Sequence, residues 1–191
     1  MSDNGADLTS IFFEGYGHHQ NSIAAYGIEA QLTGEKESLY EGGHRVPFFW
    51  HWPDKLTPRV DISNTVTYTD VYATMADIIG VDLGCNEAPD SRSMTPLLFE
   101  KEGWENGLVL HHGVVDNARK EDYSVAIREG DYKYHNGMLF NIAEDIEENH
   151  DLSGEMPEKA EEMKKRMAEA IAAVEQRERD TDIGRGPCLA K

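Results

Sequence analysis

Short apolar runs separated by turn residues follow one another in the second half of the chain. The last two runs are joined by Asn136-Gly137, and Asn-Gly between apolar runs is the strongest short-range signal for a β-hairpin. The pattern therefore predicts a small antiparallel sheet. The four predicted strands are residues 108–112, 123–128, 132–135 and 138–141.

A long helical pattern follows this block, from Pro157 to Arg179. Apolar residues recur every three or four positions, while Glu, Lys and Arg occupy the opposite face. This spacing is typical of an amphipathic helix, and proline suits a first helical position. Residues 180–191 are predicted to be a frayed tail. The apolar stripe consists of Ala160, Met163, Met167, Ile171 and Val174.

The first half of the chain has weaker patterns. A helix is predicted over residues 70–79, capped by Thr69 and ended by Gly80. Residues 46–52 are apolar and aromatic and predict a buried strand. The apolar face of the helix predicted over residues 70–79 comprises Val71, Met75, Ile78 and Ile79. The other expected segments are a long loop over 1–32, a loop over 82–94 and a short buried turn or helix over 96–99.

The chain is strongly acidic. Its 191 residues include 36 Asp and Glu against 18 Lys and Arg, which gives a formal net charge of −18 and a pI near 4.7. This charge argues against nucleic acid and anionic membranes as partners, because both require a basic surface. No run approaches the roughly 18 apolar residues that span a bilayer.

The N-terminus and the cysteines leave the cellular compartment open. Residues 1–5 lack the basic region and apolar stretch of a signal peptide. Cys85 and Cys188 are the two cysteines, too few for a disulfide framework. Neither an oxidising nor a reducing compartment is indicated.

Two segments carry candidate chemistry. Asp3-Asn4-Gly5 offers hard oxygen ligands of the kind that Ca²⁺ or Mg²⁺ prefers, although the same tripeptide is more often an ordinary turn. Lys36 precedes Glu41-Gly42-Gly43, and a lysine there can hold an oxyanion as a point charge. The alternative for Lys36 is an ordinary surface lysine before a strand.

Taken in order, the motifs of the chain resemble the C-terminal half of the formylglycine-dependent sulfatases. The resemblance covers residues 1–175, and it is the order of the motifs that makes it specific. The motifs are Ser2-Asp3-Asn4-Gly5, Lys36 with Tyr40-Glu41-Gly42-Gly43-His44-Arg45-Val46-Pro47, Trp52-Pro53-Asp54-Lys55, Tyr68-Thr69-Asp70-Val71-Tyr72-Ala73-Thr74, Asp90-Ser91-Arg92-Ser93-Met94-Thr95-Pro96-Leu97-Leu98, Ala126-Ile127-Arg128-Glu129-Gly130-Asp131-Tyr132-Lys133, Leu139-Phe140-Asn141-Ile142 and Glu147-Glu148-Asn149-His150-Asp151-Leu152.

The resemblance implies an α/β, alkaline phosphatase-like sulfatase fold of which this chain is one part. Residues 1–105 would supply the end of the large mixed sheet and its helices. Residues 106–179 would form the small C-terminal subdomain, an antiparallel sheet with a long packed helix, and 180–191 the tail. The length then predicts a fragment, a split gene or a truncated gene model rather than a stand-alone domain.

The resemblance also assigns roles to residues. In this family the Asp-Asn pair binds a divalent metal, usually calcium, which falls on Asp3 and Asn4. The catalytic lysine that contacts the sulfate falls on Lys36. His111 or His112 would line the substrate pocket. Arg45 is expected to pair with a buried carboxylate, with Glu41 as the candidate, and Arg128 is expected to be structural; His44 is assigned no role.

The family nucleophile is missing from the chain. Formylglycine is made from Cys or Ser in a Cys/Ser-x-Pro-x-Arg motif, and neither Cys85 nor Cys188 lies in one. The nucleophile is therefore expected in an absent N-terminal half, supplied as a separate chain if the gene is split. This chain alone is predicted not to turn over sulfate esters, because a nucleophile must lie within angstroms of the sulfur.

The sequence leaves several readings open. The favoured one is the C-terminal portion of a sulfuric ester hydrolase acting on a sulfated small molecule or a sulfated glycan. One alternative is a phosphoester or phosphonate hydrolase of the same superfamily, against which Asn4 argues because the relatives tend to carry His there. The other is a non-catalytic module that binds a glycan or a partner. The family favours a periplasmic or extracellular location.

Overall fold

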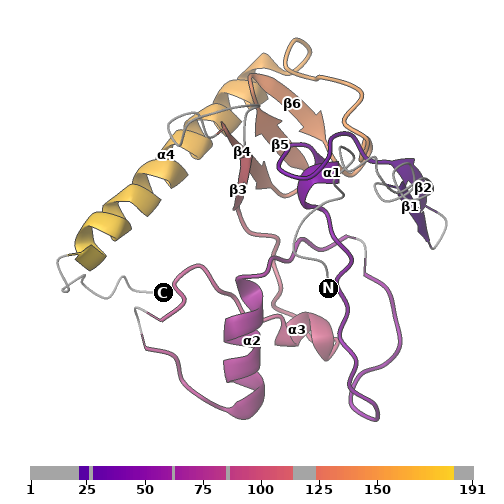
Figure 1. Cartoon of the computed structure of the whole chain (residues 1–191), viewed down its shortest axis with the longest axis vertical. Helices are drawn as coiled ribbons and strands as arrows, with labels where there is room; N and C mark the ends of the chain where they lie inside the picture. The colour runs from indigo at the N-terminus through magenta and orange to yellow at the C-terminus, as the bar shows by residue number, and fades with distance from the viewer. Residues whose placement is uncertain (1–21, 26–27, 62, 85–86, 114–123, 183–191) are drawn as a thin grey trace, which may run out of the picture. The chain divides into compact units, whose positions relative to one another are not determined.

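The computed structural model describes residues 22–25, 28–61, 63–84, 87–113 and 124–182. Its contacts divide the chain into two compact units, which we describe separately (Figure 1). The first unit comprises described residues within 1–50 and 108–170, and the second those within 51–107 and 171–191. No described helix is long and apolar enough to cross a bilayer.

The first unit is built on a four-stranded antiparallel sheet in which consecutive strands are neighbours. The predicted sheet is therefore confirmed. Asn136 and Gly137 both have positive φ, at 51° and 84°, as the tight turn of a two-residue hairpin requires. This turn pairs His135 with Met138 and Tyr134 with Leu139. The strands are β3 (Val109–Gly113), β4 (Ser124–Glu129), β5 (Tyr132–His135) and β6 (Met138–Asn141).

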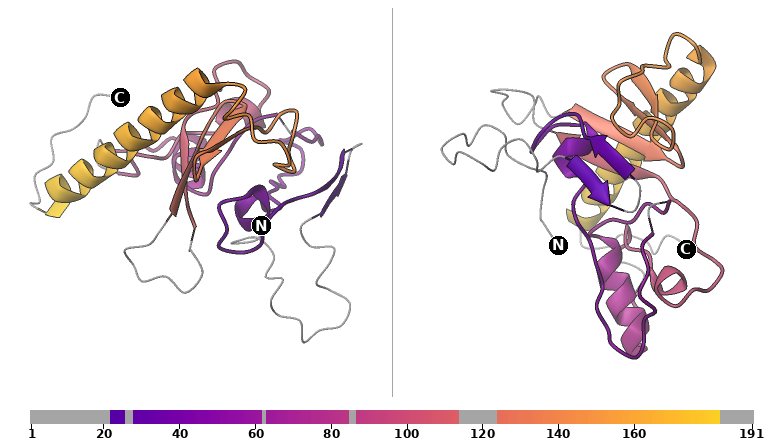
Figure 2. Two further views of the ribbon diagram at one scale, coloured as in Figure 1. Left: turned by 90° about the horizontal axis from the view of Figure 1, so that it is seen from above. Right: turned by 90° about the vertical axis from the view of Figure 1, so that its right-hand side faces the viewer.

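Helix α4 (Pro157–Asp182) packs its first half on this sheet (Figure 2). Met163 is fully buried against Ile127, Tyr134 and Leu139 of the three adjoining strands. Ala160 and Met167 pack beside it, as the helical spacing predicts. Burial of each large apolar side chain contributes about 1.5–3 kcal/mol, so this unit has a hydrophobic core of its own.

Two expectations for the N-terminal part are wrong. Strands β1 (Ser22–Ala25) and β2 (Ile28–Gln31) form an antiparallel hairpin inside the segment 1–32 that composition indicates to be a loop. Residues 46–52 are neither a strand nor buried throughout, since Phe49 and Trp52 are exposed. A strand requires a neighbour for its backbone hydrogen bonds, and no described strand pairs with this segment.

The second unit contains α2 (Asp70–Ile79) and α3 (Thr95–Leu98). Gly80 ends α2 in the left-handed conformation, with φ at 73°, as predicted. The expected cap at Thr69 is wrong, because Thr69 has helical backbone angles and its side chain makes no cap hydrogen bond. The carboxylate of Asp70 instead accepts the backbone N–H of Thr67 at 2.8 Å.

Polar groups fasten α2 to the segment before α3. Asp70 accepts the backbone N–H of Arg92 at 3.0 Å, and the Thr74 hydroxyl accepts that of Met94 at 2.9 Å. Asp70 and Thr74 are both buried, whereas Met75 and Ile79 of the predicted apolar face are exposed. The fully buried positions of this helix are therefore Asp70, Thr74 and Ala76, while Val71 and Ile78 are half-buried.

The core of the first unit can be tested at Met163. The change Met163→Ala is expected to lower the free energy of unfolding by about 2–5 kcal/mol, because it leaves a cavity between helix and sheet. Met75→Ala is the matched control and should change that free energy by about 0.5 kcal/mol or less, because Met75 is exposed. Urea unfolding followed by far-UV circular dichroism measures both. Equal losses for the two variants would contradict the assignment of the core.

Candidate functional site

Lys36 lies exposed in a closed loop between β2 and α1 (Glu41–His44). The loop is closed at its base, where the Gly42 N–H donates to the Thr33 carbonyl at 2.8 Å. A turn within it is formed by the Ser38 N–H and the Glu35 carbonyl, at 2.9 Å. The lysine that the sequence singles out is therefore presented to solvent on a short, hydrogen-bonded loop.

The adjacent glycines are required by close approach of the backbone. A Cβ on Gly42 would lie 2.6 Å from the Thr33 carbonyl oxygen, and one on Gly43 would lie 2.8 Å from that of Glu35. Both distances are too short for a real side chain. Neither glycine has positive φ, so steric contact, and not the backbone conformation, is what excludes a side chain at these two positions.

The loop also rests on the sheet of the first unit. The Thr33 hydroxyl donates to the Glu147 carbonyl at 2.6 Å. At the end of β3, a Cβ on Gly113 would lie 2.8 Å from the Glu37 carbonyl oxygen and 2.9 Å from Leu39. The backbone on either side of Lys36 is therefore held against the sheet.

Beneath the loop lies a buried ionic network centred on Lys133 of β5. Its Nζ lies 2.9 Å from Glu41 Oε1 and 2.9 Å from Glu148 Oε1. The other carboxylate oxygen of Glu148 accepts the backbone N–H of Glu41 at 2.6 Å. All three side chains are buried. Lys133 of the sheet thus binds both α1, through Glu41, and the segment before α4, through Glu148.

Two arginines complete the charge balance around Glu41. Arg45 Nε lies 2.8 Å from Glu41 Oε2 and Arg128 Nη1 lies 3.7 Å from the same oxygen. The predicted pairing of Arg45 with Glu41 is thereby confirmed, and Arg128 has the structural role expected of it. Burial would raise the pKa of Glu41, but the surrounding cations, with Lys133 the strongest, hold that pKa well below its ordinary value.

His44 belongs to the network although the sequence assigns it no role. Its Nε2 lies 3.1 Å from Lys133 Nζ, and because a lysine ammonium can only donate, Nε2 must accept. The nearby Leu39 carbonyl, at 3.3 Å from the same nitrogen, is then no hydrogen-bond partner. Burial and the charge of Lys133 lower the pKa of His44 to about 4. The ring is therefore neutral, with its proton on Nδ1.

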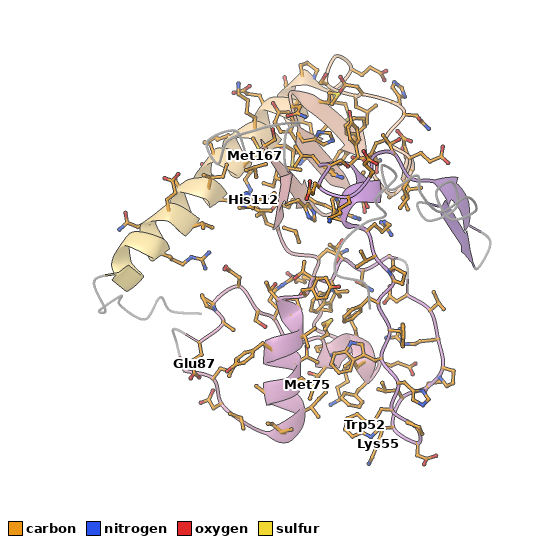
Figure 3. All side chains as sticks on the ribbon, viewed as in Figure 1. Trp52, Lys55, Met75, Glu87, His112 and Met167 are labelled. Carbon is orange, nitrogen blue, oxygen red and sulfur yellow. The ribbon has the colours of Figure 1, made fainter. Side chains whose placement is uncertain are left out.

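The two candidate pocket histidines have different surroundings. His111 stacks on His44 with ring centroids 3.9 Å apart, and its Nε2 is buried without a hydrogen-bond partner in the described part of the chain. Burial, together with the charge of Lys133, keeps the pKa of His111 well below its ordinary value. His112 is exposed (Figure 3). Neither histidine makes a hydrogen bond or ion pair with Lys36 among the described residues.

The remaining candidates are Asp3 and Asn4, which lie outside the described residues. Within the described part of the chain, no group of three or more His, Cys, Asp or Glu side chains could hold a metal ion. The assignment of Asp3 and Asn4 to a metal therefore stays a prediction.

Lys133 and Glu148 are the members of the network that sequence reasoning misses. Side chains alternate along β5, so Tyr134 faces the core and Lys133 and His135 lie on the opposite face. In an isolated hairpin that opposite face would be exposed to water. The structure buries both faces, because α1 and Glu148 cover the second one. A lysine between two aromatic residues in a strand is the weak signal that was available.

The described first unit thus combines a small antiparallel sheet packed by a long helix with a Glu-Gly-Gly segment held on it by buried polar contacts. A sequence profile of the family described as N-sulphoglucosamine sulphohydrolase, C-terminal, matches residues 33–177. The chain belongs to this family. The matched region includes Lys36, the ionic network and the described helices from α1 to the first part of α4.

Curated relatives are sulfatases as well. The chain is 29% identical to an arylsulfatase of Hemicentrotus pulcherrimus over 134 residues, which are 70% of this chain and 23% of the relative. It is 24% identical to arylsulfatase G of Mus musculus, covering 73% and 30% of the two chains. For an N-acetylgalactosamine-6-O-sulfatase of Bacteroides thetaiotaomicron the identity is 26%, with 70% and 24% covered. The chain thus spans less than a third of these relatives.

Solved structures share the fold. Ps i-CgsB superposes with a TM-score of 0.68 at 27% identity, covering 88% of this chain and 34% of its own. A second structure, from a study of glycosaminoglycan metabolism by Bacteroides thetaiotaomicron, gives a TM-score of 0.62 at 22% identity over 73% of this chain. The α/β sulfatase fold predicted from the motifs is therefore confirmed.

The ionic network can be tested at Lys133. The change Lys133→Met keeps the volume but leaves two buried carboxylates without their cation, and it should lower the free energy of unfolding by about 3–5 kcal/mol. Lys165→Met is the control, since Lys165 lies on the exposed face of α4, 3.8 Å from Glu169, and should cost about 0.5 kcal/mol or less. Urea unfolding compares them. A Lys133 variant as stable as the control would show that the network does not hold the fold.

The lowered pKa of His44 predicts a dependence of stability on pH. Between pH 6.5 and about 4 the unfolded histidine binds a proton that the folded one does not, so stability falls as the pH falls through this window. Glu41 has a lowered pKa, so its contribution is lost only below its ordinary pKa of 4.5. His44→Gln should reduce the loss between pH 6.5 and 5, and His150→Gln, at an exposed site, should not. Thermal unfolding at several pH values between 6.5 and 5 measures this loss of stability. If stability fell equally steeply with pH in the His44 and His150 variants, the assignment of the loss to His44 would be wrong.

Proposed function

We propose that this chain is the C-terminal part of a sulfuric ester hydrolase and that Lys36 contacts the sulfate group of its substrate. The observation that carries the proposal is the family match over residues 33–177, which includes the loop of Lys36. That loop is short, hydrogen-bonded and fixed to a buried ionic network. A cation held in this way suits stabilisation of charge on sulfate oxygens.

The network gives Lys36 a fixed backbone while leaving its side chain exposed. The loop is closed by the close backbone approach at Gly42 and Gly43 and by the hydrogen bond from Gly42 to Thr33. Glu41, at the end of the loop, is held by Lys133 and Glu148. Preorganised charge costs no reorganisation when a reaction occurs, which is why such loops contribute to catalysis. The acidic chain, with a net charge of −18, repels sulfate esters at a distance, so a local cation is necessary.

A divalent metal, with calcium favoured, is proposed at Asp3 and Asn4. The support is the chemistry of the donors, since a carboxylate and a carboxamide oxygen suit a hard cation. When bound, the metal would supply further positive charge beside the sulfate.

Catalysis by this chain alone is not expected. It contains no Cys/Ser-x-Pro-x-Arg sequence, and it spans less than a third of its curated relatives. We infer that formylglycine is contributed by a region corresponding to the rest of those relatives, in the same polypeptide or in a separate one.

A sulfated sugar is the substrate class that the comparisons favour. The family description names an N-sulphoglucosamine sulphohydrolase, and one relative is named as an N-acetylgalactosamine-6-O-sulfatase. The comparisons do not favour a phosphoester hydrolase. A non-catalytic binding module remains the second candidate for the chain by itself. Calorimetry of the chain with calcium and a sulfated sugar tests it, and no heat at millimolar ligand would exclude that module.

The role of Lys36 is testable in the complete enzyme, obtained by joining this chain to an in-frame upstream sequence that encodes Cys/Ser-x-Pro-x-Arg. Lys36→Ala should lower kcat/KM for a sulfate ester by about 10²–10³-fold, as removal of a group that stabilises developing charge does. Lys55→Ala is the matched control, because Lys55 is also an exposed loop lysine, and it should leave kcat/KM unchanged. Preferred turnover of phosphate over sulfate esters, or no effect of Lys36→Ala, would overturn the proposal.

A further inference from the structure

A second residue in the loop of Lys36 has an unusual backbone conformation. Glu37 has φ at 75°, in the left-handed region that glycine adopts freely and that is costly for other residues. It occupies the third position of the turn in which the Ser38 N–H donates to the Glu35 carbonyl at 2.9 Å. A positive φ at this position is typical of a type II turn, which normally places glycine or asparagine there. The turn therefore carries a glutamate where glycine would fit with less strain.

The surrounding backbone leaves Glu37 no room to relax. A Cβ on Gly113 would lie 2.8 Å from the Glu37 carbonyl oxygen, and one on Gly43 would lie 2.3 Å from the carbonyl oxygen of Ser38. Leu39, two residues further on, is buried. Because these contacts involve the backbone and neighbouring side chains, the packing of the loop imposes the conformation on position 37.

The side chain of Glu37 does not compensate for this strain. It is exposed, as is that of Lys36 beside it. Within the residues that the structure describes, the Glu37 carboxylate has no hydrogen-bond or ion-pair partner. Folded chains break a local conformational rule chiefly at functional positions, where the side chain has another use. The use of this carboxylate is therefore to be sought in solvent, next to Lys36.

We propose that Glu37 is a specificity residue whose carboxylate accepts a hydrogen bond from a hydroxyl or ammonium group beside the sulfate of the substrate. The inference rests on the proposed function, in which Lys36 contacts that sulfate. Consecutive Cα atoms lie about 3.8 Å apart, so the two charged side chains can reach one small ligand. A ligand that matches both carries a sulfate ester and, next to it, a hydrogen-bond donor, as a sulfated sugar does.

The charge of Glu37 makes this contact selective in two ways. Hydrogen bonds with a charged partner are about twice as strong as those between neutral groups. A sulfate ester that lacks a donor at this place meets only the repulsion of the carboxylate. One residue thus favours the substrate with the donor and disfavours the substrate without it.

The experiment uses the complete enzyme, in which this chain is joined to its upstream sequence, and two probes, phenyl sulfate and 2-hydroxyphenyl sulfate. The ratio of their kcat/KM values is compared between variants, so their different intrinsic reactivity cancels. Glu37→Gly should lower the preference for the hydroxylated probe by about tenfold or more. Glu37→Gln should lower it by only about threefold, because a neutral amide oxygen still accepts a hydrogen bond.

Glu100→Gly is the matched control for the change of backbone conformation. Glu100 is an exposed glutamate with φ at 54° in the second unit, and its replacement should leave the ratio unchanged. An equal fall of the ratio in the Glu100 variant would overturn the role of Glu37.

Thermal unfolding of the isolated chain tests the strain by itself. Glu37→Gly should unfold about 2–4 °C above Glu37→Ala, because glycine alone adopts the left-handed conformation at little cost. Equal midpoints for the two variants would show that position 37 does not require this conformation, and the argument for Glu37 would fail.

The outcomes separate this inference from the proposed function. If both probes were hydrolysed in a Lys36-dependent way and Glu37→Gly left their ratio unchanged, the role of Glu37 would be wrong and the proposed function would stand. Release of sulfate from neither probe by the complete enzyme would overturn the proposed function, and the role of Glu37 would be lost with it.

Discussion

The contact between Lys133 and the carboxylates of Glu41 and Glu148 is the interaction on which the first unit depends. It joins three parts of the chain that are far apart in sequence: α1, β5 and the segment before α4. A buried ion pair adds little free energy relative to apolar packing of equal volume, but loss of one member leaves a costly unpaired charge. The network therefore fixes which segments meet, and it places the loop of Lys36 on the sheet.

This arrangement separates the rigid and the exposed parts of the candidate site. Glycines at 42 and 43 let the loop close on itself, and Gly113 lets it lie against β3. His44 and His111 stay neutral beside Lys133 because burial lowers their pKa values. The exposed side chain of Lys36 is then presented to solvent by a backbone that is held from beneath.

The two units differ in how much of their apolar side-chain surface they bury within themselves. The sheet of the first unit buries Ile127, Tyr134 and Leu139 under Met163 of α4. In the second unit, α2 is held by buried polar contacts and several of its apolar side chains are exposed. A domain with a complete core has the opposite arrangement. The second unit therefore leaves large apolar side chains of α2 exposed, whereas the described sheet of the first unit buries its own.

Local patterns in the sequence determined the elements whose partners are close along the chain. Asn136-Gly137 specified the β5–β6 hairpin, the spacing of Ala160, Met163 and Met167 specified the packed face of α4, and the order of the motifs specified the family. These signals suffice because turn geometry and helical periodicity act over a few residues. The pairing of Arg45 with Glu41, four residues apart, was accessible for the same reason.

Only the tertiary structure decided which polar residues are buried. Lys133 and Glu148 are ordinary surface residues by sequence, and they become a buried pair because α1 covers the second face of β5. The run 46–52 has the composition of a buried strand, yet among the described strands it has no neighbour to pair with. Burial and strand pairing are properties of contacts between distant segments, so composition and periodicity at one position cannot determine them.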